Sequence, residues 1–136
     1  MGGLLLDTCA LIWVMTDDRL SEDSRLRISA SGEAGKLWLS PISAWEIATL
    51  VARGRLHLTM SPEDWFEAAL ATPGLNLAAM PPKVLVQSAF LPGTAPNDPA
   101  DRIVLATARA NDLTVVTRDA RIIAYGRAGN ARVLAC

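Results

Sequence analysis

Five carboxylates stand out in the 136-residue sequence, because each lies just after a predicted strand or early in the helix that follows. They are Asp7, Glu46, Asp98, Asp101 and Asp119. Carboxylates gathered within a few ångström repel one another, which raises their pKa values, and a divalent cation relieves this repulsion. Oxygen ligands without His or Cys favour Mg²⁺ or Mn²⁺ over zinc. If the fold gathers these acids, the pattern predicts a Mg²⁺ site, with Mn²⁺ as the alternative ion.

A single histidine argues against two other kinds of site. His57 lies in a loop-like stretch, so neither a Ser-His-Asp triad nor a zinc site built on several histidines is expected. The phosphate-binding signatures GxGxxG and GxxxxGK do not occur in the sequence. The acids therefore remain the strongest chemical signal in the chain.

Composition narrows the class of protein further. Hydrophobic residues make up 51% of the chain and charged residues 20%, which is enough apolar surface for a core. Thirteen Lys and Arg against fourteen Asp and Glu exclude a strongly basic nucleic-acid-binding domain, although local patches can still bind nucleic acid. Two cysteines make no disulfide framework, and no apolar stretch reaches the ~20 residues of a membrane span. We expect one cytoplasmic domain, residues 1–136, without a membrane segment.

Strands alternate with helices along the sequence. The predicted strands, which are short apolar runs, span residues 3–6, 36–39, 75–79, 113–117 and 132–135. The predicted helices, most of which begin at a Ser or Asp cap or at a Ser-Pro or Asp-Pro step, span residues 8–15, 21–30, 40–53, 61–70, 82–90, 98–110 and 119–125. This order predicts an α/β fold with a parallel sheet between layers of helices.

The predicted sheet is what must position the acids. In such folds the ligand crevice lies at the carboxyl ends of the strands. Asp7 directly follows the first predicted strand, Asp119 lies two residues past the fourth, and Glu46 lies in the helix after the second. We therefore expect these segments, which are far apart in sequence, to meet in one crevice.

Each acid also has a purely structural interpretation. Asp98 before Pro99 is a strong helix N-cap, and Asp101 then occupies the third helical position, where an acid stabilises the helix. Asp7 and Asp119 could cap helices in the same way. Glu46 is harder to explain as structure, because its helix is otherwise almost wholly apolar. Taken one at a time the acids favour capping, and taken together they favour a site.

Three segments of the sequence resemble a known family. The runs LLLDTCALIW, SPISAWEIA and NDPADRIVLATARANDLTVVTRD resemble PIN-domain ribonucleases, and among these the VapC-type toxins of bacterial toxin–antitoxin pairs. The resemblance extends over nearly the whole chain. It implies a PIN-like three-layer fold, with a parallel sheet of about five strands flanked by helices.

The resemblance also assigns roles to individual residues. It implies a catalytic and metal-binding quartet, Asp7, Glu46, Asp101 and Asp119, with Asp98 as an additional acid. It implies polar neighbours of the metal site at three further positions: Thr8, Ser43 and Thr117. The family implies an RNA substrate, a cognate VapB-like antitoxin and a homodimer.

The sequence departs from the family pattern at three positions. Many relatives carry His-Arg where this chain has Pro96 and Asn97, and a Lys where it has Leu50. Arg102 and Arg118 are candidates to replace a lost RNA contact, although either could instead pair with Asp98 or Asp119. The four tryptophans sit on apolar stripes and are expected in the core or in a dimer interface.

The leading hypothesis is an Mg²⁺-dependent endoribonuclease that acts as the toxin of a toxin–antitoxin pair. In this hypothesis a metal-activated water attacks the scissile phosphorus. Two alternatives remain at this point. One is a receiver-type phosphoacceptor signalling domain, and the other is a catalytically inactive PIN binding module.

Overall fold

The structure of the chain, a computed structural model, describes residues 2–16 and 20–136. The strands of this part of the chain are β1 (Leu4–Leu6), β2 (Leu37–Leu39), β3 (Leu75–Leu77), β4 (Thr114–Thr117) and β5 (Arg132–Ala135). Its helices are α1 (Thr8–Thr16), α2 (Glu22–Glu33), α3 (Ile42–Ala52), α4 (Pro62–Leu70), α5 (Pro82–Ala89), α6 (Pro99–Asn111) and α7 (Ala120–Arg127). Every element predicted from the sequence is present, with bounds that differ by a few residues.

The strands form one parallel sheet with the order β3-β2-β1-β4-β5. The central strand β1 pairs with β2 and β4, so that Leu5 lies between Trp38 and Val115. The predicted α/β class is therefore confirmed. Because parallel strands all point the same way, the segments that follow β1 and β4 emerge side by side.

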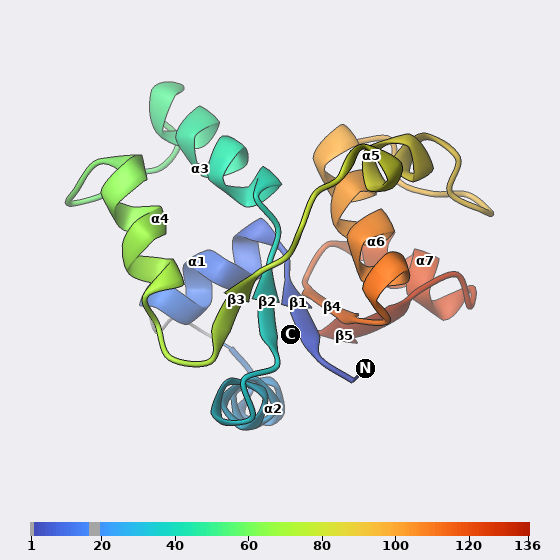
Figure 1. Cartoon of the computed structure of the whole chain (residues 1–136), viewed down its shortest axis with the longest axis horizontal. Coiled ribbons are helices and arrows are strands. Elements are labelled where there is room, and N and C mark those ends of the chain that lie inside the picture. The colour runs from blue at the N-terminus through green and yellow to red at the C-terminus, as the bar shows by residue number, and fades with distance from the viewer. Residues whose placement is uncertain (1, 17–19) are drawn as a thin grey trace.

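The sheet divides the core into two layers. Successive residues of a strand point to opposite faces, so Leu4 and Leu6 pack on one side and Leu5 on the other. Figure 1 shows α1 and α4 on one side of the sheet and α5, α6 and α7 on the other. The side chains of Leu5 and Leu6 are completely buried, as expected for a strand covered on both faces.

Polar caps set the starts of most helices, as the sequence predicts. Ser61 Oγ accepts a hydrogen bond from the backbone N–H of Asp64 at 3.1 Å, and Ser21 caps α2 in the same way. At α3 the start differs by one residue. Ser40 Oγ accepts from the N–H of Ile42 at 3.2 Å, and Pro41 occupies the cap position instead of the first helical turn.

None of the helices in the described residues is both long and apolar enough to span a membrane.

Candidate active site

A pocket of about 280 Å³ opens beside the carboxyl ends of β1 and β4. Its walls come from α1, α3, α6 and the junction between β4 and α7, and it is lined by Asp7, Thr8, Cys9, Trp13, Glu46, Asp101, Val104, Arg118 and Asp119. The structure thus brings the four acids of the predicted quartet into one hollow. The parallel sheet achieves this because the chain leaves neighbouring strands at the same edge.

Asp7 is the most deeply buried of these acids, with 8% of its surface exposed. Its Oδ1 caps α1 by accepting the N–H of Ala10 at 2.8 Å, and its Oδ2 accepts a hydrogen bond from the Thr117 hydroxyl. Burial raises the pKa of Asp7, while the hydrogen bonds from Thr117 and Ala10 offset part of that rise. Asp7 therefore both caps a helix and faces the pocket.

Glu46 is held by a chain of two hydroxyl groups. The Thr8 hydroxyl donates to Glu46 Oε1 and lies 3.0 Å from the Ser43 hydroxyl. A hydroxyl carries one proton. Because Thr8 donates its proton to Glu46, Ser43 is the donor in the bond between Ser43 and Thr8. Burial raises the pKa of Glu46, and the bond from Thr8 lowers it in part. Ser43 is completely buried, so it supports the site through its bond to Thr8.

Asp101 lies early in α6 and lines the same pocket as Glu46. Burial, followed by the charges of Asp98, Asp119, Glu46 and Asp7, raises its pKa to about 7. In the part of the chain that the structure describes, no side chain donates a hydrogen bond to its carboxylate. Burial and the neighbouring charges therefore both favour the protonated form of Asp101.

Asp119 differs from the other three because it has a cationic partner. Its carboxylate caps α7 and forms an ion pair with Arg121 at 3.0 Å. The side-chain hydrogen bond from Arg121 is the main cause that lowers the pKa of Asp119. Sequence reasoning offered Arg118 as a partner for Asp119 and missed Arg121. The available signal was its place two residues beyond the cap, in the first turn of the helix.

Asp98 and Arg102 have structural roles. Asp98 is exposed, does not line the pocket, and caps α6 by accepting the N–H of Asp101 at 3.0 Å. The Arg102 guanidinium donates to the carbonyls of Ser88 at 2.8 Å and Pro96 at 2.9 Å. These bonds join α6 to α5 and the loop between them. In the described residues the Arg102 guanidinium thus engages backbone carbonyls instead of forming the ion pair with Asp98 that the sequence suggested.

Arg118 and Trp13 form a stacked pair at the pocket. The Arg118 Cζ lies 3.9 Å from the centroid of the Trp13 ring, and Arg118 Nε donates to the backbone oxygen of Cys136 at 3.1 Å. Trp13 therefore lines the pocket, where the sequence led us to expect core or interface. Trp65 is buried as expected, whereas Trp45 is 61% exposed and is not part of the core.

Cys9 was also missed by sequence reasoning. It lies one helical turn before Trp13 in α1, and residues four apart share a helix face, which is the signal that could have found both. Burial and then the charges of Asp7, Glu46 and the other pocket acids raise the pKa of the Cys9 thiol to about 11. The thiol therefore keeps its proton at neutral pH and is a poor nucleophile.

The donor chemistry of the pocket fits a hard divalent cation. Four carboxylates line it beside a single cationic side chain of the lining, Arg118. Burial and then the neighbouring negative charges raise the pKa of Asp101, and a cation in the pocket would offset both. The oxygens do not yet converge, since among residues 2–16 and 20–136 no three His, Cys, Asp or Glu side chains stand close enough to hold an ion. A bound cation would have to draw them inward.

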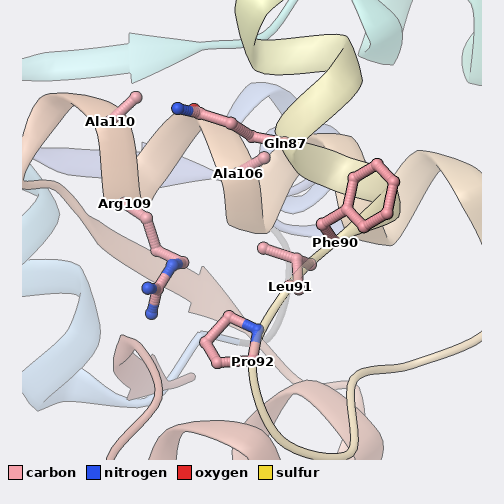
Figure 2. A pocket seen from close by; sticks show the side chains of 7 residues that line it. All are labelled: Gln87, Phe90, Leu91, Pro92, Ala106, Arg109 and Ala110. Atoms are coloured by element: carbon pink, nitrogen blue, oxygen red, sulfur yellow. The ribbon is translucent and has the colours of Figure 1, made fainter.

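A second hollow, of about 290 Å³, has a different lining from the acidic pocket. Figure 2 shows its lining side chains, which come from α5, the loop after it and α6. This lining, which contains no carboxylate, consists of Gln87, Phe90, Leu91, Pro92, Ala106, Arg109 and Ala110. The second hollow therefore lacks the ligands of a cation site.

The fold and the pocket together define a class, a parallel α/β domain with a cluster of acids at its strand ends. The chain belongs to the PIN domain family, whose pattern it matches over residues 4–128. The resemblance noted from the sequence is confirmed. The family assignment also excludes the receiver-type alternative.

The relatives agree with this assignment. Ribonuclease VapC22 of Mycobacterium tuberculosis is 30% identical over 125 residues, which cover 90% of this chain and 91% of that protein. Among solved structures, VapBC2 from Rickettsia felis bound to a promoter DNA fragment matches with a TM-score of 0.69 at 14% identity, over 99% of this chain and 98% of that chain. FitAcB from Neisseria gonorrhoeae matches with a TM-score of 0.59 at 22% identity, over 96% of each chain. At these identities the two structures support the fold.

Proposed function

We propose that this chain, as a single PIN domain over residues 1–136, is a Mg²⁺-dependent endoribonuclease and the toxin of a toxin–antitoxin pair. The observation that carries the proposal is the pocket in which four acids meet, where burial and then the charges of the neighbouring acids raise the pKa of Asp101 to about 7. The similarity to Ribonuclease VapC22 supports RNA as the substrate. Mn²⁺ has the same preference for oxygen ligands and is the alternative ion.

The residues of the pocket have different roles in binding the cation. Asp7 and Glu46, oriented by Thr117 and Thr8, are the fixed ligands of the cation. Asp101 and Asp119, which line the same pocket, complete the ligand set. When bound, the cation lowers the pKa of a water and neutralises the charge that develops on the leaving oxygen.

The protein residues prepare the pocket for that chemistry. The Asp101 carboxyl, whose pKa is raised to about 7, would lose its proton more readily beside a positive charge, so that all four acids could be ionised together. Asp98, which caps α6, adds negative potential from outside the pocket. Cleavage in this way leaves a 5′-phosphate and a 3′-hydroxyl.

The proposal also includes partners. We infer a VapB-like antitoxin, a homodimer and a cytoplasmic site of action, where RNA is accessible. The structural similarity to VapBC and FitAB assemblies is consistent with such a pair. An antitoxin arginine that entered the pocket would compete with both cation and substrate for the carboxylates.

The direct test of the activity is cleavage of cellular RNA by the purified chain with Mg²⁺. We expect cleavage that EDTA abolishes, that added Mg²⁺ restores, and that Asp7→Asn lacks. Equal cleavage by Asp7→Asn would assign the activity to a contaminant. No cleavage by the unaltered chain under any divalent cation would favour the remaining alternative, an inactive PIN binding module.

The test of the partner is genetic. Expression of the chain alone should arrest growth, and co-expression of a short reading frame adjacent to its gene should relieve that arrest. Arrest that persists with the neighbouring product present would contradict the pair, and it would leave the nuclease proposal intact.

A further inference from the structure

The stacked pair of Trp13 and Arg118 lies in the wall of the same pocket as the four acids. Trp13 lies on α1, and Arg118 lies between β4 and the cap of α7, next to Asp119. With the Arg118 Cζ 3.9 Å from the centroid of the indole ring, the guanidinium rests directly on the ring. Two elements from distant parts of the sequence thus build one layered surface beside the acids.

Two of the contacts that Arg118 makes hold its guanidinium in place. It lies over the indole ring of Trp13, and Arg118 Nε donates to the Cys136 backbone oxygen at 3.1 Å. Arg118 nevertheless remains exposed to solvent and lines the pocket. A ligand in the pocket can therefore reach Arg118.

In a nuclease, a flat, delocalised cation held in this way is suited to stacking against an unpaired nucleobase. Proteins that recognise single-stranded RNA stack unpaired bases on aromatic rings and on guanidinium planes. Stacking uses the face of the guanidinium, so it is compatible with hydrogen bonds along its edge. A Lys carries the same charge but has no plane on which a base can stack.

We propose that Arg118, positioned by Trp13, is the stacking platform for the nucleobase next to the scissile phosphate. This inference depends on the proposed ribonuclease function and adds to it the recognition of an unstacked base beside the cleaved bond. Arg118 is the contact residue, and Trp13 is a positioning residue that holds the guanidinium plane in place. The contact makes the enzyme favour an unpaired base at this position, and stacking of this kind accepts any base.

The experiment compares paired RNA substrates. Single-stranded oligonucleotides that span a mapped cleavage site are made with the normal base, or with an abasic sugar, on either side of the cleaved phosphate. For the unaltered protein we expect kcat/KM to fall about tenfold for the abasic substrate on one side only, as the loss of one stacked base implies. The ratio of the two rates is compared within one protein, so it does not depend on how much of each variant is folded.

The variants then assign the effect to the pair. Arg118→Lys should bring the ratio of intact to abasic rates to about one while cleavage persists, and Arg127→Lys, an exposed arginine at the other end of α7, should leave the ratio unchanged. Trp13→Leu should lower the ratio, and Trp13→Phe should restore much of it. A purely structural role for Trp13 would lower both rates together.

The outcomes separate this inference from the one on which it depends. If the unaltered protein cleaves no RNA, so that no cleavage site can be mapped, the ribonuclease proposal fails and the platform fails with it. If cleavage occurs but the base on neither side matters, or if Arg118→Lys retains the tenfold ratio, only the platform is overturned.

Discussion

Two carboxylates of the pocket each accept a hydrogen bond from a threonine hydroxyl, and the other two accept none from the threonines of the described residues. Asp7 is bonded by Thr117 and Glu46 by Thr8. By contrast, Asp101 has a pKa raised to about 7, and Asp119 is paired with the exposed Arg121. We call Asp7 and Glu46, with their threonines, the hydroxyl-held wall of the pocket, and Asp101 and Asp119 its open wall.

The difference between the walls shows two ways in which a fold can accommodate carboxylates that repel one another. The hydroxyl groups on the first wall are buried and belong to elements that start or end at the sheet, so they hold the carboxylates in place. The open wall responds instead, by taking up a proton at Asp101 or by engaging a solvent-exposed cation at Asp119. We therefore expect substitutions on the hydroxyl-held wall to affect activity most.

The largest effect should follow the loss of charge at Glu46. Glu46→Gln keeps the volume of the side chain but removes a negative ligand, and we expect kcat/KM to fall by more than about 100-fold, beyond the range seen for residues that only support a ligand. Glu63→Gln, the same change at an exposed acid in the first turn of α4, should leave the rate unchanged. Comparable rates for the two variants would mean that Glu46 is not part of the site.

The next effect tests the hydroxyl group itself. Thr117→Val is nearly isosteric and removes the donor to Asp7 and the acceptor for the N–H of Asp119. We expect activity to fall by about 10- to 100-fold and Thr117→Ser to recover most of it. The control is Thr107→Val, at a buried threonine whose hydroxyl bonds only within α6. A similar loss of activity in the control would show that packing, not support of Asp7, sets the rate.

These roles bear on what could be predicted from the sequence. The acids of the quartet could be predicted because each follows a recognisable strand or helix start, and a parallel sheet gathers strand ends whatever the details of packing. The helix caps at Ser61 and Asp98 could be predicted equally well, because capping depends only on residues close together in the sequence. Only the start of α3, at Pro41, was displaced, by one residue.

The direction in which a long side chain turns in the folded protein could not be predicted in the same way. Arg102 lies beside a pocket acid in the sequence, yet its guanidinium turns to the carbonyls of Ser88 and Pro96. Trp13 belongs to an apolar run, yet it lines the pocket. Which way a long side chain turns depends on the neighbours supplied by distant segments, and spacing along one helix does not contain that information.

A smaller effect concerns stability and pH on the open wall. The folded chain holds the Asp101 proton with a pKa of about 7, above the ordinary 3.8 expected once unfolded. The folded state therefore binds this proton more tightly, and its contribution to stability is lost as pH rises towards and through 7. We expect the free energy of unfolding without metal to drop by about 1 kcal/mol from this group, after allowance for screening.

Denaturant titrations at pH 5 and pH 8 measure this drop, with Asp101→Asn as the comparison. The variant should lose that part of the pH dependence and should be the more stable protein at pH 8, because it no longer holds a repelled charge. Mg²⁺ should reduce the difference for the unaltered chain. An equal pH dependence in both proteins would show that the repulsion does not centre on Asp101.

The smallest effect is expected at the ion pair of the open wall. Arg121 is 66% exposed on its side chain, and a pair so accessible to water and salt contributes little. Asp119 also keeps its bond to the backbone N–H of residue 121, at 2.8 Å, whatever side chain stands there. We expect Arg121→Gln to change kcat/KM by no more than about twofold, and Arg132→Gln, which breaks an exposed pair of 2.9 Å with Asp112, provides the matched baseline. A tenfold loss in Arg121→Gln alone would show that the open wall depends on its arginine as the other wall depends on its threonines, and the distinction between the two walls would fail.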